Sequence, residues 1–139
     1  MSVGATHIDH VVIAANDSAA VARHFAESYG IEIKRTMSRP GTGAHLAFAK
    51  LEEVILEFAG PGKPPEGEEV RARLGGFVLA VEDIENAVHR VRAAGYEVTE
   101  PKPAVQPGAK IATIKSGTHG VPLAFIQYNA IPAEGTTTA

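Results

Sequence analysis

The sequence contains no cysteine and no tryptophan, and it has only five phenylalanines and three tyrosines. Without cysteine the chain can form no disulfide framework, no thiolate zinc site and no cysteine nucleophile. The few aromatic side chains leave little surface on which a bound molecule could stack. These absences favour a site built from histidine, carboxylates and basic side chains.

Neither charge nor hydropathy indicates binding to a nucleic acid or a membrane. The net charge is −3 with histidine neutral, so there is no basic field for nucleic acid. No apolar run approaches the ~20 residues that span a bilayer. The opening residues lack the charged and apolar regions of a signal peptide. We therefore expect a cytoplasmic protein whose partner is a small organic molecule.

A length of 139 residues suits a single domain, and the sequence repeats one pattern within it. The stretch "DHVVIAANDSAAVARHFAESYGIEIKR" is echoed by "GGFVLAVEDIENAVHRVRAAGYEVTEP". Each has an apolar run, then acidic or amide residues, then helical spacing, then a glycine beside a tyrosine. Later, "GAHLAFAKLEEVILEFAGP" is echoed by "GAKIATIKSGTHGVPLAFIQY". The repeat indicates two similar modules.

Periodicity predicts a β-α-β-β-β order in each module. Acids and amides supply the helix N-caps, and Gly30 and Gly95 end the helices. We expect an α+β fold in which two tandem modules form a curved mixed sheet, with a concave pocket and the helices outside. The single domain 1–139 would contain module one (about 7–60), a linker (about 61–75), module two (about 76–128) and a flexible tail (129–139). The predicted strands are 11–14, 31–35, 44–50, 54–59, 77–81, 96–99, 110–114 and 122–128.

Strand alternation predicts which side chains line the concave face. Most are small or branched and apolar, and four polar groups stand among them. An apolar pocket with a few convergent polar groups is typical of a small-molecule site. Alternatively, the small residues only allow two layers to approach closely. The residues expected to contact a bound molecule, beside His10 and Glu57, are His45, Lys110, Val12, Ala47, Ile55, Val78, Ala112, Ile114 and Ala124.

The repeat, with "IDHVVIAANDSAAVARHF" and "VEDIENAVHRVRAAGYEV", resembles the vicinal oxygen chelate (glyoxalase/bleomycin resistance/dioxygenase) superfamily over roughly residues 7–128. The resemblance implies four metal-ligand positions, on the first and last strand of each module. His10 and Glu57 fill two of them, but Gly76 and Ala124 occupy the others and cannot ligate. We expect no metal and no other cofactor; His10 and Glu57 would be the ligands if a metal were bound. The resemblance also implies a homodimer.

A buried histidine beside a carboxylate is suited to general acid/base catalysis. We therefore expect an enzyme of metal-independent isomerase or lyase type, which transfers a proton, opens a ring or forms one. His10 and Glu57 would be catalytic, and Lys110 would stabilise negative charge. The loop "TMSRPGTG", with Arg39, could hold an acidic substrate.

Three alternatives stay open at this point. His10 and Glu57 could form a purely structural pair. The protein could sequester a drug or metabolite without chemistry, like the bleomycin-resistance members of the family. It could also be a metal-dependent enzyme like the glyoxalases and dioxygenases, which Gly76 and Ala124 disfavour.

Overall fold

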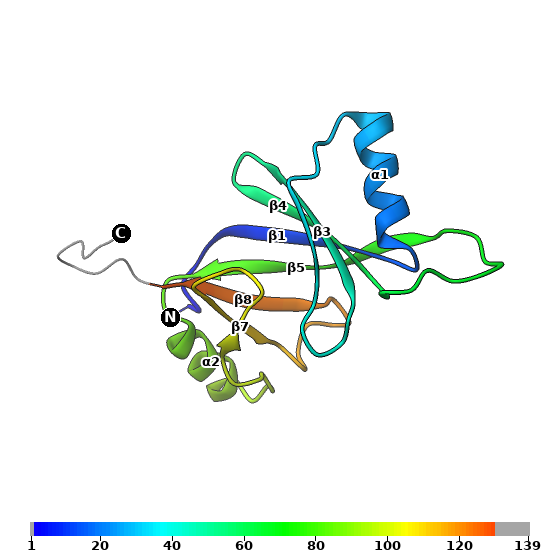
Figure 1. The fold of residues 1–139 in the computed structure, drawn as a ribbon. Coiled ribbons are helices and arrows are strands. Elements are labelled where there is room, and N and C mark those ends of the chain that lie inside the picture. Colours follow the sequence, from blue (N-terminus) through cyan, green and yellow to red (C-terminus); the bar gives the residue numbers. More distant parts are fainter. Residues whose placement is uncertain (1, 130–139) are drawn as a thin grey trace. The chain divides into compact units, whose positions relative to one another are not determined.

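The computed structural model describes residues 2–129, and its elements follow the predicted order β-α-β-β-β twice (Figure 1). The first series is β1 (Ala5–Ala15), α1 (Ser18–Tyr29), β2 (Arg35–Ser38), β3 (His45–Leu51) and β4 (Val54–Gly60). The second is β5 (Ala72–Val81), α2 (Ile84–Ala93), β6 (Lys102–Pro103), β7 (Ala109–Thr113) and β8 (Leu123–Tyr128). The tail expected at 129–139 lies outside the described residues except for its first residue.

Both helices begin where the sequence places a capping aspartate. Asp17 accepts a hydrogen bond from the backbone N–H of Ala20, and Asp83 accepts one from Asn86. These side chains satisfy backbone donors that have no partner within the helix. At its other end α1 stops at Gly30, which is left-handed with φ 71°, a conformation that costs glycine little.

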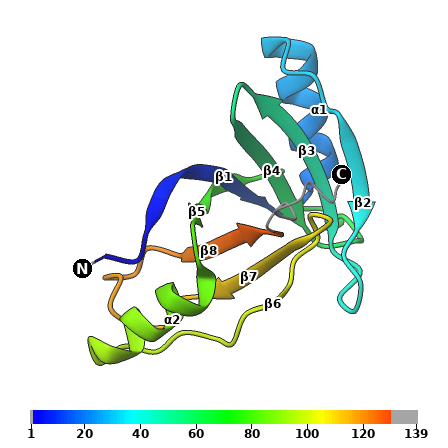
Figure 2. The same ribbon diagram turned by 90° about the vertical axis from the view of Figure 1, so that its left-hand side faces the viewer.

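The chain divides into two compact units, of which one comprises residues 8–78. Here β4 pairs in parallel with β1 and antiparallel with β3, and β3 pairs antiparallel with β2. Helix α1 packs on this part of the sheet (Figure 2). Val21 and Ala22 of α1 lie in one core with Ala47 and Phe58, and the rings of Phe25 and Phe58 meet edge to face at 5.1 Å.

The other unit comprises residues up to 7 and from 79 on. Within it β7 pairs antiparallel with both β6 and β8. Helix α2 covers these strands with Ile84 and Val88, which lie in one core with Ala112 and Phe125. Each helix therefore buries its apolar side against the strands of its own series.

Strands β1 and β5 contribute to both units, and the hydrogen-bonded order is β2-β3-β4-β1-β5-β8-β7-β6. The protein is thus an α+β fold with a mixed eight-stranded sheet and two helices, which confirms the predicted class. Among the described residues, neither helix has the length and apolar character needed to cross a membrane.

The second strand of each series differs from the sequence prediction. In the first series it begins at Arg35 rather than Ile31, because Ile33 packs into the core under α1 and pairing with β3 starts only afterwards. In the second series residues 96–99 form no strand and make a single bridge, between Val98 and Ile114. The prolines at 101 and 103 lack an N–H group, which limits pairing on this edge to β6.

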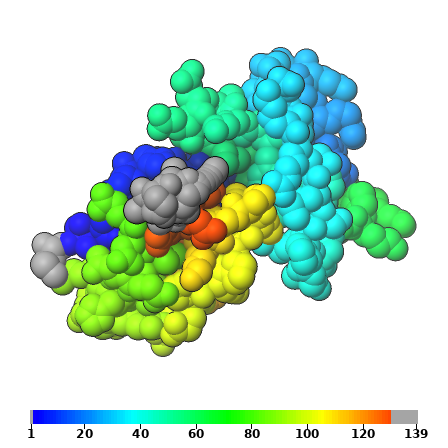
Figure 3. Space-filling view, turned by 60° about the vertical axis from the view of Figure 1, so that its left-hand side comes forward, coloured from blue at the N-terminus to red at the C-terminus, as the bar shows by residue number. Residues whose placement is uncertain are grey.

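The predicted linker is shorter in the structure, because β5 already begins at Ala72. The remaining loop after β4 projects from the surface, in green in Figure 3. Gly75 lies where β5 passes close to β1, and a Cβ atom at this position would stand 3.0 Å from the Cβ of Ala14. A glycine here permits that close approach.

Candidate functional site

Two strands of residues 8–78 bring the main sequence candidates onto one face of the sheet. The parallel register pairs His10 with Ile55 and Val12 with Glu57. Register partners project to the same side of a sheet, so these four side chains share a face. Phe58, the neighbour of Glu57, lies on the opposite side, in the core under α1. We call the side that carries His10 and Glu57 the site face.

His10 lies between two carboxylates. Its Nδ1 is 2.9 Å from Oδ2 of Asp9, and its Nε2 is 3.4 Å from Oε1 of Glu57. His10, Glu57 and Asp9 are only 3%, 4% and 5% exposed. Because an ionised carboxylate can only accept, the ring donates its Nδ1–H to Asp9. Nε2 is then the nitrogen that can exchange a proton with Glu57 or with a bound molecule.

Arg39 places a positive charge on the other oxygen of Glu57. Its Nη2 lies 3.4 Å from Oε2 of Glu57, and its side chain is 40% exposed. The register explains this reach, because Phe48 of β3 pairs with Glu57 on one side and with Arg35 on the other. Arg39 follows Arg35 by an even number of residues and approaches the same face. It is the member of the group that solvent reaches.

Each polar side chain of this group has a partner within it. A buried charge without a partner is costly, and both carboxylates are buried. His10 contacts both of them, and Arg39 supplies a positive charge beside Glu57. The buried carboxylate of Glu57 therefore lies between the ring of His10 and the guanidinium of Arg39.

Asp9 was not predicted as a site residue, and Arg39 was expected only as a loop arginine that could hold an acidic substrate. Successive residues of a strand point to opposite faces, so alternation assigns Asp9 to the side away from His10. The contact is nevertheless made, between neighbouring side chains of β1. The signal was the adjacency of the two residues in "HIDH".

The predicted faces of β3 are wrong. Ala47 is fully buried in the core under α1, where it pairs with Phe58, and it does not lie on the site face. His45 points to the same side as Ala47, and its Nδ1 lies 2.8 Å from Oγ of Ser18, the first residue of α1.

The site face of β3 carries Leu46 and Phe48 instead, which pair with Ala59 and Glu57 of β4. Size misled the assignment, because the larger side chains were expected to meet the helix.

The Ser18–His45 pair resembles part of a nucleophilic dyad but has the features of a structural contact. Ser18 is 1% exposed, and its hydroxyl also donates to the backbone carbonyl of His45 at 3.0 Å. A serine nucleophile needs access to its substrate and a base whose orientation a third group fixes. The pair instead ties the start of α1 to β3.

The predicted faces of β7 are also wrong. Ala112 and Ile114 pack into the core with α2, and not on the side of β7 that faces away from this helix. Lys110 shares their side by alternation, and its register partner is Gln127, whose side chain accepts a hydrogen bond from the first residue of α2. Lys110 therefore lies on the helix side of β7, which removes it as the group that stabilises negative charge.

Four apolar candidates lie on the side that the sequence predicted. Val12 and Ile55 belong to the site face with His10 and Glu57. Val78 and Ala124 alternate with Leu79 and Phe125, which pack against α2, and so point away from that helix. Contact of these four with a bound molecule stays a prediction.

The side chains do not fit the metal site that the family resemblance implies. Within residues 2–129 no three histidine, cysteine, aspartate or glutamate side chains form a group suited to a metal ion. Gly76 and Ala124 offer no donor at the two positions that should complete the set. Arg39 also places a positive charge beside Glu57, which opposes a second cation there.

A family model supplies the identification. The model described as "Glyoxalase/Bleomycin resistance protein/Dioxygenase superfamily" matches residues 9–113. The chain belongs to this superfamily. No curated protein sequence matches the chain significantly.

Several solved structures share the fold at low identity. A methylmalonyl-CoA epimerase from Mycobacterium tuberculosis is 16% identical with a TM-score of 0.76, over 99% of this chain and 95% of its own. A variant of the Streptomyces coelicolor methylmalonyl-CoA epimerase, in complex with 2-nitronate-propionyl-CoA, is 22% identical with a TM-score of 0.74, over 91% and 100%. A hypothetical protein from Bacillus halodurans is 21% identical with a TM-score of 0.74, over 88% and 94%. These likenesses show the fold alone.

Proposed function

We propose that this member of the superfamily is a small-molecule enzyme of isomerase or lyase type that uses a metal-independent proton transfer. The observation that carries the proposal is the buried imidazole of His10 between the carboxylates of Asp9 and Glu57. Here one nitrogen is held by a neighbour, and the other faces a second titratable group, an arrangement suited to a general acid/base.

In the proposed reaction Nε2 of His10 removes a proton from a carbon beside a carbonyl group. Asp9 keeps the proton of His10 on Nδ1, so that Nε2 can accept. Glu57 faces the same nitrogen, so it can take this proton from Nε2 or return it. Return of the proton to the same carbon gives an isomer; expulsion of a group from the neighbouring carbon gives a lyase product.

Arg39 takes the role that was expected of Lys110. The carbonyl oxygen of the substrate becomes negative as the proton leaves, and a guanidinium beside it stabilises that charge. Arg39 lies at Glu57 and reaches solvent, so it can meet a substrate that enters from outside. Its planar donors suit an oxyanion or a carboxylate.

The test is exchange of carbon-bound protons with solvent deuterium, followed by proton NMR. A panel of 2-oxo acids, acyl thioesters and cyclic lactones would be incubated with the parent protein and with His10→Ala. Methylmalonyl-CoA belongs in the panel because its epimerases share this fold. We expect exchange in at least one compound with the parent protein and none above background with His10→Ala. Equal exchange with both proteins across the panel would refute the proposal.

The second candidate is a protein that binds a drug or metabolite without chemistry. The observation that favours it is Phe48, which the structure places on the site face, where its buried ring lies beside Glu57. Arg35 already lies over this ring at 5.4 Å, so a stacked ligand would have to displace it. Tight binding of a compound that the protein leaves unchanged, with no exchange anywhere in the panel, would favour this candidate.

We also propose a homodimer. The edge strands β2 and β6 leave backbone groups unpaired, and covering such edges or the adjoining faces is a common reason for pairing.

A further inference from the structure

A pocket of about 410 Å³ lies at the far end of β1 from His10, entirely within residues 8–78. Its lining is Ala14, Ala15 and Asn16 from the end of β1 and Arg71, Ala72 and Arg73 from the start of β5. It contains neither His10 nor Glu57, and the proposed chemistry uses none of its residues. Its small side chains leave the space, and its two arginines give it a positive lining.

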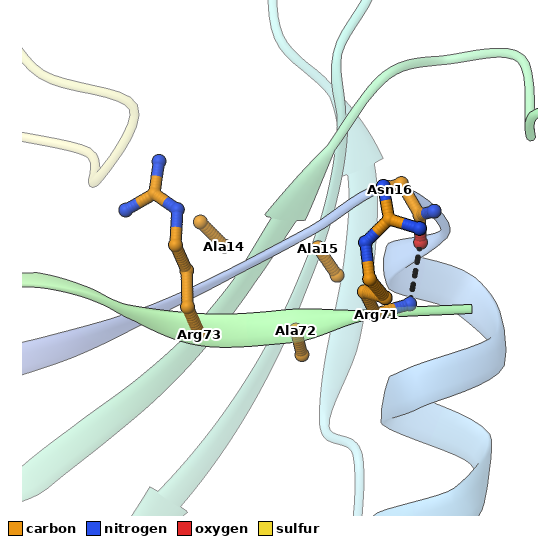
Figure 4. A pocket seen from close by; sticks show the side chains of 6 residues that line it. All are labelled: Ala14, Ala15, Asn16, Arg71, Ala72 and Arg73. Atoms are coloured by element: carbon orange, nitrogen blue, oxygen red, sulfur yellow. Dashed lines mark hydrogen bonds between the residues drawn. The ribbon is translucent and has the colours of Figure 1, made fainter. Parts of the chain in front are cut away.

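The two arginines project to one side of β5. Figure 4 shows the side chains of Arg71 and Arg73 on the same side, with Ala72 directed away from them. Alternate residues of a strand stand about 6.6 Å apart, so both guanidinium groups can reach one anionic group. Their planar arrays of donors match the oxygens of a carboxylate or a phosphate.

The backbone that carries the arginines is fixed by Asn16. Its Oδ1 accepts from the N–H of Arg71 at 2.8 Å, and its Nδ2 donates to the carbonyl of Glu69 at 2.9 Å. Its own N–H donates to the carbonyl of Arg71 at 3.1 Å. The amide of Asn16 is thus used in holding the start of β5 to β1, and it leaves the arginines as the groups available to a ligand.

The guanidinium groups have little protein charge to neutralise them. Among residues 2–129, the side chain of Arg73 makes no ion pair or hydrogen bond, and the side chain of Arg71 meets only Glu68, at 3.8 Å and with both side chains exposed. An exposed pair at that distance contributes little. The two arginines therefore line the pocket with positive charge that no carboxylate of the protein neutralises well. Their arrangement suits an anion from outside the protein.

The pocket and the proposed acid/base lie on the same face of β1. Ala14 follows His10 by four residues, and the register with β4 is regular between them. Four residues of strand span about 13 Å. Ala14 also lies against Gly75, an even number of residues from Arg73, which agrees with the side on which Arg73 projects in Figure 4.

We propose that Arg71 and Arg73 bind an anionic group of the same substrate on which His10 acts, at a pocket that begins about 13 Å along β1 from His10. The substrate class is thus a carbonyl compound with a carboxylate or phosphate at its far end. The evidence for the anion site is the pocket and its two arginines, whereas the link to the substrate rests on the proposed function.

The first experiment measures the anion site without any substrate. Inorganic phosphate and, separately, acetate are titrated into the full chain while the side-chain Nε–H signals of the arginines are followed by NMR. We expect phosphate to shift the signals of Arg71 and Arg73 saturably and to leave those of Arg23 unchanged. Saturation by acetate as well would point to a site open to carboxylates, and saturation by phosphate alone would point to a phosphorylated substrate.

The matched variants are Arg73→Gln and, on the exposed surface of α1, Arg23→Gln, which removes the same charge. Arg73→Gln should weaken phosphate binding about 10-fold, the loss expected for one charge-assisted contact, whereas Arg23→Gln should leave it unchanged. Non-saturating shifts, or equal affinities in the two variants, would overturn the anion site.

The second experiment tests the link to the substrate. With a compound that exchanges its proton and carries a distal anionic group, Arg73→Gln should raise KM about 10-fold and change kcat less than about twofold. A neutral analogue of that compound should show no such difference. If exchange occurs but Arg73→Gln matches Arg23→Gln in KM, the link is wrong while the proposed function stands. If no compound exchanges, the proposed function fails and takes the link with it, and the phosphate titration still decides the anion site.

Discussion

Oε1 of Glu57 lies 3.4 Å from Nε2 of His10, although the two residues come from strands at opposite ends of the first module. The parallel pairing of β1 with β4 produces this contact, because it aligns Glu57 with Val12, two residues beyond His10 on the same face. Both groups are buried, so each depends on the other and on its remaining neighbour for its charge to be balanced.

The first prediction concerns this pair. His10→Ala and Glu57→Gln should each lower kcat roughly 10²–10⁴-fold, the usual contribution of a general acid/base. The kcat of the double variant should be only slightly lower than that of the less active single variant, since the two groups act as a unit. Steady-state kinetics on a compound that exchanges its proton measures this, and circular dichroism controls for folding. Turnover at the parent rate in both folded variants would contradict the assignment.

The second prediction concerns Asp9, a positioning residue. An asparagine in its place keeps the shape but can donate its own N–H to Nδ1 of His10, which would move the ring proton to Nε2 and block the base. Asp9→Asn should then lower kcat about 10²-fold with KM little changed.

The ring tautomer gives a readout that needs no substrate. Nitrogen-15 NMR of the neutral imidazole should place the proton on Nδ1 in the parent protein and on Nε2 in Asp9→Asn. The same tautomer in both proteins would show that Asp9 does not orient His10.

The third prediction separates the observed face of β3 from the one that alternation suggested. Ala47 is fully buried under α1, so Ala47→Leu should overpack that core and lower the free energy of unfolding by about 1–3 kcal/mol. Ala93→Leu, at an exposed position in α2, is the control and should change it by less than about 0.5 kcal/mol. Urea denaturation measures both, and equal midpoints would argue against the placement of Ala47.

The fourth prediction is that activity does not require a bound divalent metal. The positions of Gly76 and Ala124 offer no ligand, and Arg39 engages Glu57. Protein purified without chelator should contain far less than one equivalent of zinc, iron or manganese by elemental analysis. Loss of activity with EDTA and recovery with one of these ions would reverse this view.

The fifth prediction is a homodimer in solution. Sedimentation equilibrium at micromolar concentration should give about twice the chain mass of 14.6 kDa. A single species at the mass of the chain would exclude the dimer under those conditions.

The sequence by itself determined the order of elements, the helix boundaries and one face of the site. The repeated pattern predicted the two βαβββ series, since helical spacing and capping aspartates are local signals that need no tertiary information. Strand alternation also placed His10 and Glu57 on one face. Their strands carry large apolar residues at the alternate positions, Ile13 in β1 and Phe58 in β4, and these residues do pack under α1.

Only the tertiary structure decided the faces of β3 and β7. Both faces of these strands are largely apolar, so no alternation of polar and apolar residues tells them apart, and side-chain size gave the wrong answer for Ala47 of β3. In the structure the small residues lie under the helices, and Phe58 and Phe125 of the neighbouring strands fill the cores beside them.

The remaining partners of the site were also decided by tertiary structure. Arg39 reaches Glu57 through the pairing of β2 with β3, and Arg71 and Arg73 meet the end of β1 through the hydrogen bonds of Asn16. These contacts join segments far apart in the chain, and no local pattern encodes the register that brings them together. The contact of Asp9 with His10 is local in sequence, yet strand alternation would place the two side chains on opposite faces. A hydrogen bond between the neighbouring side chains brings them together instead.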